Sequence, residues 1–240
     1  MKKLLNVSNL NVNYGGVCAV INFSLNVYEG QIVSITGANG SGKSSTLNAL
    51  SGIQKPSSGE IVFLGERITG FSAHRIVKRG LVQVPEGRHL FPNLSVRENL
   101  LTGNHCKGGL LLSKSIPENL LKIFPILSDR LDTNASSLSG GQAQMLALAR
   151  GMMTNPILLL LDEPTLGLSP IMVKEVFNLF SILRDKGLTI LVVEQNVRRT
   201  LEISDYAYVI ESGMMVMEGK GTDLLNDSRL VKSFFGFENS

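Results

Sequence analysis

The stretch of the chain best suited to chemistry covers residues 37–44 and reads GANGSGKS. Its three glycines let successive backbone N–H groups surround an anion, because side chains there would block the close approach of phosphate oxygens. Lys43 adds a mobile cation for β- and γ-phosphates, and the Ser44 hydroxyl is a hard oxygen ligand suited to Mg²⁺. A β-branched apolar run precedes the stretch and a run with helical spacing follows it, which is the context that this motif requires. The stretch therefore predicts a phosphate-binding loop rather than a glycine-rich turn with a chance lysine.

Two adjacent carboxylates, Asp162 and Glu163, follow the apolar run at residues 157–161. At the tip of a buried strand, Asp162 can hold Mg²⁺ through water, and Glu163 can orient or polarise an attacking water. An Asp-Glu pair after a strand is also a common turn. Its combination with the phosphate-binding loop favours the catalytic interpretation.

A third candidate is the pentad LSGGQ at residues 138–142. Ser139 is a good N-cap for the helix that follows it. Gly140 and Gly141 lie in the first turn of that helix and cost roughly 1 kcal/mol each relative to Ala, so we expect another group to approach this backbone closely. A helix N-terminus with free N–H groups can bind an anion, although the chain already has such a site in its phosphate-binding loop.

The elements that position these residues predict an α/β fold of one domain, residues 1–240. We expect a P-loop NTPase core with a mostly parallel sheet and helices, a small antiparallel β-subdomain, and a helical subdomain inserted at residues 90–154. Expected strands cover residues 4–14, 19–28, 31–36, 60–64, 81–84, 157–161 and 188–193, with a hairpin at 206–217. Expected helices cover residues 45–50, 73–79, 96–101 after Ser95, 117–124, 138–153, 170–186, 197–203 and 223–237, with a loop at 103–114. Phe234, Phe235 and Phe237 are expected to pack back on the domain.

Two aromatic positions keep alternative interpretations. Tyr14 ends an early strand, at the rim of the small sheet, and its ring could either stack on a purine or pack on its neighbours. Leu90, Phe91 and Pro92 place apolar side chains beside residues 85–88, which we expect to form a loop at the carboxyl edge of the sheet, where ligands bind. They could form core packing or a docking groove for another protein.

Composition excludes several classes of protein. The apolar fraction of 43% is ample for a buried core, and a net charge of +3 lacks the strongly basic balance of a duplex-binding domain. The two cysteines, Cys18 and Cys106, are too few for a disulfide framework and fit a reducing compartment. We expect neither a secretory signal at the amino terminus nor a transmembrane run. Work at a membrane would then require docking on another chain.

In this order, the phosphate-binding loop, the pentad and the carboxylate pair resemble those of ATP-binding subunits of ABC transporters. The loop is shared by many NTPases, whereas the pentad between it and the carboxylates is highly specific. The resemblance implies that two such subunits meet head to tail, so that Ser139, Gly140, Gly141 and Gln142 of one close over the γ-phosphate held by the other. It also implies that Tyr14 stacks on adenine, and that the bound nucleotide is ATP with Mg²⁺.

Three positions depart from the usual pattern of that family. Glu86 replaces a glutamine, Ser169 replaces an aspartate, and Gln195 replaces a histidine. The segments around them, VPEGR, LGLSP and VEQN, resemble one subgroup, the second ATPase of branched-chain amino acid importers and of similar urea importers. Gln195 can still donate an amide hydrogen to a γ-phosphate, but unlike histidine it does not titrate near neutral pH.

The resemblance assigns a role to each candidate residue. Glu163, Gln195 and Lys43 are the expected catalytic residues, and Ser44, Glu86 and Asp162 the expected metal ligands. The expected nucleotide-binding residues are Tyr14, Gly37, Ala38, Asn39, Gly40, Ser41, Gly42, Lys43, Ser44, Ser45, Ser139, Gly140, Gly141 and Gln142. Groups from the loop, together with the metal, stabilise the charge that develops in phosphoryl transfer.

The function implied is an ATPase that couples hydrolysis to import of branched-chain amino acids. Its expected partners are a second ATPase subunit, identical or related, and a membrane permease, with no nucleic acid, at the cytoplasmic face of the cell membrane. Alternatives are an importer ATPase for urea or another small solute, a lipid exporter ATPase, a soluble ABC ATPase acting on DNA or ribosomes, and an inactive regulatory subunit that binds ATP. Intact Lys43, Asp162 and Glu163 argue against the last.

Overall fold

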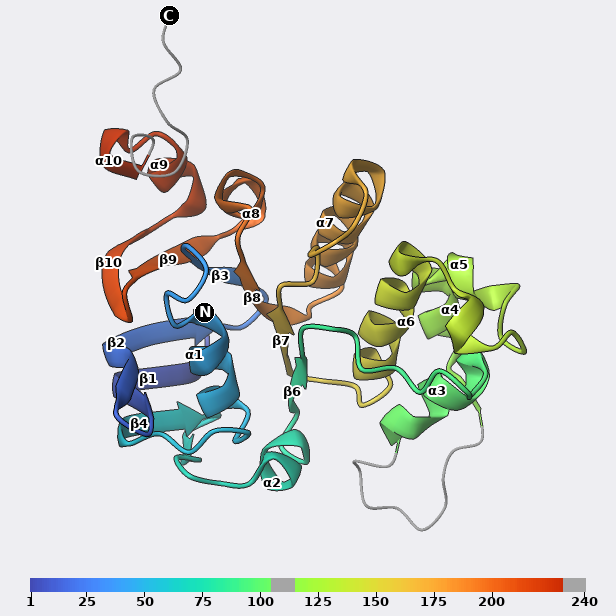
Figure 1. The fold of residues 1–240 in the computed structure, drawn as a ribbon, viewed down its shortest axis with the longest axis horizontal. Coiled ribbons are helices and arrows are strands. Elements are labelled where there is room, and N and C mark those ends of the chain that lie inside the picture. Colours follow the sequence, from blue (N-terminus) through green and yellow to red (C-terminus); the bar gives the residue numbers. More distant parts are fainter. Residues whose placement is uncertain (105–114, 231–240) are drawn as a thin grey trace, which may run out of the picture.

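The computed structural model describes residues 1–104 and 115–230. Two sheets form its framework (Figure 1). The larger sheet has the order β10-β9-β3-β8-β7-β6, and all its neighbouring pairs are parallel except β9 and β10. The smaller sheet, β2-β1-β4-β5, is antiparallel. The expected α/β core and small antiparallel sheet are therefore both present.

The strands of the larger sheet are β3 (Ile32–Thr36), β6 (Leu81–Val84), β7 (Leu158–Asp162), β8 (Thr189–Glu194), β9 (Tyr206–Glu211) and β10 (Met214–Gly219). Those of the smaller sheet are β1 (Lys3–Tyr14), β2 (Val17–Tyr28), β4 (Ser58–Phe63) and β5 (Glu66–Arg67). The helices are α1 (Lys43–Leu50), α2 (Ala73–Val77), α3 (Val96–Thr102), α4 (Glu118–Ile123), α5 (Pro125–Ser128), α6 (Gly140–Met152), α7 (Pro170–Asp185), α8 (Val197–Ile203), α9 (Gly221–Leu225) and α10 (Ser228–Leu230), with a 3₁₀ turn at Ala135–Ser137.

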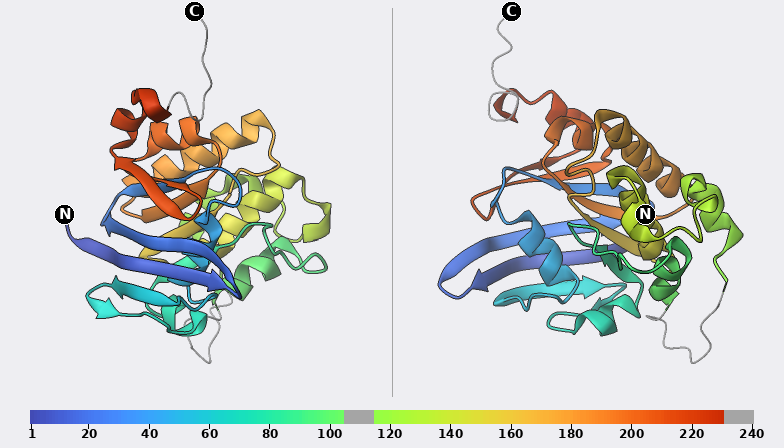
Figure 2. Two further views of the ribbon diagram at one scale, coloured as in Figure 1. Left: turned by 60° about the vertical axis from the view of Figure 1, so that its left-hand side comes forward. Right: turned by 45° about the vertical axis from the view of Figure 1, so that its right-hand side comes forward.

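The central strands β3, β7 and β8 of the larger sheet are buried along their whole length, as their nearly continuous apolar sequences require, whereas the edge strand β10 is largely exposed. Along β7, Leu158 and Leu160 belong to a cluster with α1 and the smaller sheet, whereas Leu159 and Leu161 pack with α3, α6 and α7. Successive side chains of a strand point to opposite faces, so one apolar run fills both cores. Helix α1 thus lies between the two sheets (Figure 2).

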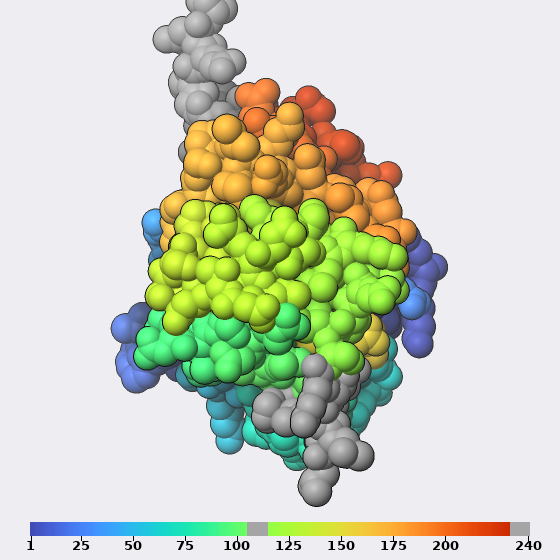
Figure 3. Space-filling model, turned by 90° about the vertical axis from the view of Figure 1, so that its right-hand side faces the viewer, coloured from blue at the N-terminus to red at the C-terminus, as the bar shows by residue number. Residues whose placement is uncertain are grey.

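The helices α3 to α6 form a layer at one side of the molecule, beside α7 (Figure 3). Helix α3 begins with a capping box: the Ser95 hydroxyl accepts from the Glu98 N–H at 3.2 Å, and the Glu98 carboxylate accepts from the Ser95 N–H at 2.7 Å. Buried Asn99 then donates to the carbonyl oxygens of Phe91 and Ser95 at 3.0 Å each. These bonds fix the entry of the chain into the helical layer.

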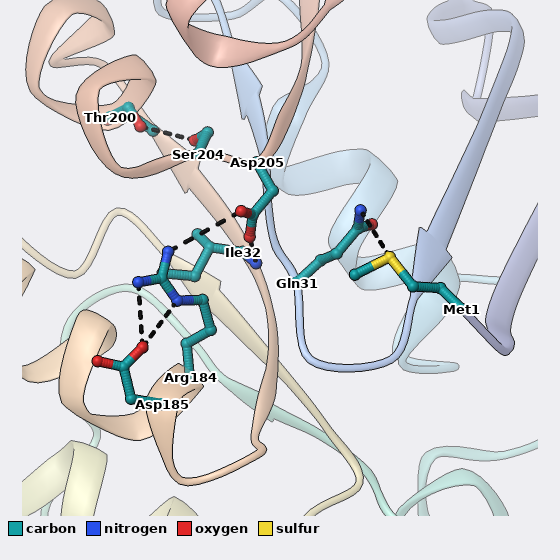
Figure 4. Close-up of polar contacts among 8 residues, drawn as sticks. All are labelled: Met1, Gln31, Ile32, Arg184, Asp185, Thr200, Ser204 and Asp205. Atoms are coloured by element: carbon teal, nitrogen blue, oxygen red, sulfur yellow. Dashed lines mark hydrogen bonds and ion pairs between the residues drawn. The ribbon is translucent and has the colours of Figure 1, made fainter.

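Polar contacts anchor the amino end of β3, the strand whose carboxyl end leads into the phosphate-binding loop (Figure 4). The Asp205 carboxylate accepts from the Ile32 N–H at 2.8 Å, and the Arg184 guanidinium approaches its other oxygen to 3.9 Å. The Ser204 hydroxyl donates to the Thr200 carbonyl oxygen at 2.6 Å. The Asp205 contacts join the carboxyl ends of α7 and α8 to the strand that carries the loop, and the Ser204 bond lies within the end of α8.

Some element boundaries differ from the prediction. Helix α2 ends at Val77 rather than at residue 79, and a separate short helix, α5, follows α4 with Pro125 at its start. The expected long carboxyl-terminal helix is wrong within the described residues, because α9 ends at Leu225 and α10 starts at Ser228. The Asp227 carboxylate accepts from the Arg229 N–H at 2.8 Å, and such a side-chain bond competes with continued helix.

Some expectations fall partly or wholly outside the described residues. They are most of the loop at residues 103–114, with Cys106, and the tail beyond residue 230, with Phe234, Phe235 and Phe237. Within residues 1–104 and 115–230, no helix combines the length and apolarity that crossing a bilayer requires.

Candidate active site

The phosphate-binding loop connects the carboxyl end of β3 to α1. Two of its glycines are required by close backbone neighbours: a Cβ on Gly37 would collide with the Ile210 carbonyl oxygen, and one on Gly42, with φ of +104°, would collide with that of Ala19. A Cβ on Gly40 would meet nothing within 4 Å. The loop is therefore packed tightly against β2 and β9, while its tip at Gly40 faces open space.

Lys43 lies at the start of α1 with only 4% of its surface exposed. Its ammonium donates to the carbonyl oxygens of Gly37 and Ala38 at 2.9 Å each, and it lies 3.4 Å from a carboxylate oxygen of Glu163. The cation is thus held inside the loop, where phosphates of a nucleotide would exchange for these acceptors.

Ser44 and Asp162 meet although they come from different elements. The Ser44 hydroxyl donates to the Asp162 carboxylate at 2.8 Å. Burial raises the pKa of Asp162, the Ser44 hydrogen bond opposes that shift, and the negative charges of Glu86 and Glu163 add to it. Because the negative charge of Asp162 is disfavoured here, a cation bound beside it would stabilise that charge.

The oxygen ligands fit Mg²⁺ rather than a transition metal. Among the residues that the structure describes, no group of three or more His, Cys, Asp or Glu side chains could hold a metal ion. Mg²⁺ is usually bound through one or two protein ligands together with substrate phosphates and water. The Ser44 and Asp162 pair provides such an incomplete set of hard oxygens.

Glu163 follows β7 in a left-handed conformation, with φ of +45°. Its N–H donates to the Val193 carbonyl oxygen of β8 at 2.9 Å, and its side chain is 8% exposed. For a non-glycine residue this conformation is uncommon and costs of order 1 kcal/mol. The surrounding contacts therefore hold the Glu163 carboxylate at one position beside Lys43.

A cleft of about 370 Å³ opens over these residues. It is lined by Ala19, Asn39, Gly40, Gly42, Lys43, Ser44, Ser45, Glu86, Glu163, Leu166 and Gln195. A second, more open cleft of about 620 Å³ adjoins it and includes Glu86, Ser44 and Asp162. The structure thus brings the loop, both carboxylates, Glu86 and Gln195 around shared space, although they come from four different parts of the chain.

The pentad lies elsewhere. Ser139 and Gln142 form a capping box, with the Ser139 hydroxyl accepting from the Gln142 N–H at 3.3 Å and the Gln142 side chain accepting from the Ser139 N–H at 3.0 Å. Ser139 and Gly140 are exposed. None of the described residues that line the 370 Å³ cleft belongs to the pentad. This helix end is therefore open to an external group rather than to the cleft of its own chain.

Tyr14 is also outside the cleft lining as the structure describes it. Its ring is 44% exposed at the end of β1, where it pairs with Val17 of β2. Ala19, further along β2, does line the cleft. Tyr14 thus lies on the hairpin that borders the cleft, with a face available for stacking.

Several residues that support the site were not singled out from the sequence. Arg150 of α6 donates to the carbonyl oxygens of Arg88 and His89 at 2.9 and 2.8 Å, and so ties the loop carrying Glu86 to the helix of the pentad. Arg88 itself donates to Gln144 at 3.3 Å. Polar contacts between distant segments have no periodic signal, which is why sequence patterns did not reveal them.

Thr165 and Glu194 form a second such contact. Thr165 follows the carboxylate pair, and Glu194 precedes Gln195. Their side chains are joined by a buried hydrogen bond, and neither residue lines the cleft. The sequence signal was a charged residue, Glu194, at the end of an otherwise apolar buried strand.

The chain is similar in sequence to known proteins. The family model described as "ABC transporter" matches residues 20–166. The high-affinity branched-chain amino acid transport ATP-binding protein BraG of Pseudomonas aeruginosa is 38% identical, over 97% of this chain and 100% of that protein. The lipopolysaccharide export system ATP-binding protein LptB of Haemophilus influenzae is 31% identical, over 97% of each.

Two solved structures are similar over nearly their whole length. The ADP conformation of an ATP-binding cassette of an ABC transporter has a TM-score of 0.82 and 29% identity, covering 98% of this chain and 100% of that chain. The dimeric structure of a bacterial ABC transporter cassette has a TM-score of 0.79 and 25% identity, covering 93% of this chain and 100% of that chain.

Proposed function

Because this chain belongs to the ATP-binding proteins of ABC transporters, with their ATPase activity, we propose that it powers the import of branched-chain amino acids through a membrane permease. The observation that carries the choice of solute is the 38% identity to BraG over essentially both chains. The VPEGR, LGLSP and VEQN segments support the same subgroup.

Nucleotide binding depends on the loop at residues 37–44. The open tip at Gly40 admits phosphate oxygens to the backbone N–H groups, and the Lys43 ammonium turns from the Gly37 and Ala38 carbonyl oxygens toward the β- and γ-phosphates. Ser41, Ser45 and Asn39 complete the phosphate side, and Tyr14 stacks on the adenine. The tight packing of Gly37 and Gly42 keeps the loop in the binding conformation.

Ser44 and Asp162 would hold Mg²⁺, with Glu86 at the adjoining wall of the cleft. When bound, the ion would neutralise charge on the β- and γ-phosphates. Its ligands on this chain are hydrogen-bonded to each other and partly desolvated, so they are already positioned for a cation.

Glu163 and Gln195 have different roles toward the reacting phosphate. The Glu163 carboxylate orients and deprotonates the attacking water, because it lines the cleft and lies 3.4 Å from the Lys43 ammonium proposed to bind the phosphates. The Gln195 amide donates to a γ-phosphate oxygen as negative charge develops there. Both line the same cleft, which is the geometry that these two roles require.

A second ATPase subunit completes the site. The exposed Ser139 and Gly140 offer a capped helix N-terminus to the γ-phosphate bound by the partner. The existence of a similar cassette as a dimer supports this arrangement. The partner is a second copy or a related chain.

The permease docks in a groove of about 360 Å³ between the sheet core and the helical layer. Phe91, which is 50% exposed, lines this groove with Val77, Val84, His89 and Ala147. Leu90 packs against the helical core, so this apolar segment serves core and groove together. This docking places the chain on the cytoplasmic face of the cell membrane.

The test is uptake of radiolabelled leucine, isoleucine and valine by cells in which this gene is deleted and then restored. We expect uptake to be lost on deletion, restored by the native chain and not restored by Lys43→Ala. Unchanged uptake on deletion would reject the import proposal. Co-purification of the permease from native membranes would identify the partner.

Export of a lipid is the second candidate, favoured by the 31% identity to LptB. It predicts that deletion leaves amino acid uptake intact and instead changes the lipid composition of the cell surface. Loss of urea uptake alone would point to the urea importers.

A further inference from the structure

A buried carboxylate joins the two loops that carry the proposed catalytic groups. Glu194, at the end of β8, is 2% exposed. One of its carboxylate oxygens accepts from the Thr165 N–H at 2.9 Å and from the Thr165 hydroxyl at 2.6 Å. Thr165 is itself 8% exposed, so both hydrogen bonds are shielded from water.

These two residues lie next to the groups that act on ATP. Thr165 is in the loop after β7, which carries Glu163 and Leu166, and Glu194 directly precedes Gln195. Glu163, Leu166 and Gln195 all line the 370 Å³ cleft, whereas Thr165 and Glu194 do not. The Thr165–Glu194 contact thus joins the two loops without lining the cleft.

The choice of a carboxylate here needs an explanation. Among the described residues, no ion pair with a cationic side chain involves Glu194, and burying a carboxylate without such a partner is unfavourable. Burial accordingly raises the pKa of Glu194, while the bonds from Thr165 oppose the shift. Packing alone would be served better by an apolar side chain. What the Glu194 side chain adds, and an apolar side chain cannot, is an oxygen that accepts both donors of Thr165.

We propose that Glu194 is a positioning residue, which sets the spacing between Glu163 and Gln195 by holding Thr165. This rests on the proposed roles of Glu163 and Gln195 in hydrolysis. Misplacing a reacting group by about 1 Å can slow a reaction by about 100-fold. Loss of the contact therefore slows hydrolysis, whereas ATP binding depends on the loop at residues 37–44 and is retained.

The experiment measures steady-state ATPase kinetics of the purified full chain and variants. Thr165→Val removes the hydroxyl donor and Thr165→Ser keeps it. We expect kcat to fall by about 10- to 100-fold in Thr165→Val and in Glu194→Ala, with KM for ATP within about twofold of the native value, and Thr165→Ser to retain most of kcat. Glu202→Ala, on the exposed face of α8, is the matched control and should behave as the native chain.

A double variant distinguishes positioning from general damage to the fold. If Glu194 acts through Thr165, Glu194→Ala combined with Thr165→Val should be no slower than the slower single variant. Additive losses, a rise in KM with unchanged kcat, or equal activity of Thr165→Ser and Thr165→Val would each overturn the proposal. If Glu194→Ala fails to fold, the Thr165 pair alone decides.

The outcome also separates this inference from the function on which it rests. Hydrolysis by the native chain, its loss in Glu163→Gln and native rates in Thr165→Val would leave the proposed function intact and reject only the positioning role. Absence of hydrolysis by the native chain, both alone and together with the ATPase subunit that co-purifies with it, would reject both.

Discussion

The Lys43 ammonium lies 3.4 Å from the Glu163 carboxylate, and both side chains are almost fully buried. The cation proposed to bind phosphate and the carboxylate proposed to orient water therefore neutralise each other within the cleft. Removal of one partner from a buried pair leaves an uncompensated charge, whereas removal of both does not.

Lys43→Ala should abolish ATP binding and also destabilise the fold. Glu163 would remain buried without its cation, so we expect the free energy of unfolding to fall by about 1–3 kcal/mol, measured by urea denaturation without nucleotide. The double variant Lys43→Ala with Glu163→Gln should recover stability but not binding. Undiminished ATP binding in Lys43→Ala would contradict the assignment of the loop.

Glu163→Gln should spare ATP binding and slow hydrolysis by about 100-fold or more, because the amide cannot accept a proton from water. With ATP and Mg²⁺ the variant should accumulate as a dimer in gel filtration, since separation of the subunits follows hydrolysis. A profile showing only monomer would count against the head-to-tail site.

Asp162→Asn should stabilise the nucleotide-free chain at neutral pH. Because burial raises the pKa of Asp162, the protonated form contributes stability that is fully present below the unfolded value of 3.8 and is lost as pH rises through the folded pKa. At pH 7 the native carboxylate is therefore destabilising, and its amide replacement should raise the Tm by an amount that vanishes near pH 4. Thermal melts of the native chain and of Asp162→Asn between pH 4 and 7 measure this change in Tm, with the exposed Asp129→Asn as control. A Tm of Asp162→Asn below that of the native chain at pH 7 would refute the prediction.

Gly140→Ala should lower ATPase activity without lowering the stability of the fold. A Cβ at this position would lie no closer than 3.5 Å to the Arg88 guanidinium, an ordinary contact, so the Tm should not fall. ATPase activity should decrease, because the methyl group would occupy the approach to the partner's phosphate. Gly141→Ala is a contrasting variant: its Cβ would lie 2.6 Å from the end of the Met172 side chain, which must move. Native ATPase activity in Gly140→Ala would show that nothing approaches this helix end.

We expect position 195 to add no pH dependence to the ATPase rate between about pH 6 and 8, because the Gln195 amide does not titrate in that range. Gln195→His should introduce an inflection near the ordinary histidine pKa of about 6.5. The measurement is the ATPase rate of the native chain and of Gln195→His as a function of pH at saturating ATP. An inflection in the native chain that Gln195→Ala abolishes would contradict the prediction.

The sequence was most informative where chemistry is local. The loop at residues 37–44 sits between a strand and a helix as expected, and Ser95 and Ser139 cap their helices, because these arrangements depend on neighbouring residues alone. The resemblance to ATP-binding subunits of ABC transporters is confirmed. The division at residues 90–154 and the roles of the individual site residues stay predictions. The break between α9 and α10 was missed because it depends on a single side-chain bond from Asp227.

Taken alone, the sequence determined the fold class, the family and the residue types around the nucleotide, since apolar periodicity, glycine spacing and capping are short-range properties. Only the tertiary structure decided which distant groups meet. Ile210 and Ala19 require Gly37 and Gly42, Glu163 pairs with Lys43, and Thr165 is held by Glu194. Each is a contact between separate elements, and its existence depends on how the two sheets and the helical layer pack, which local patterns do not encode.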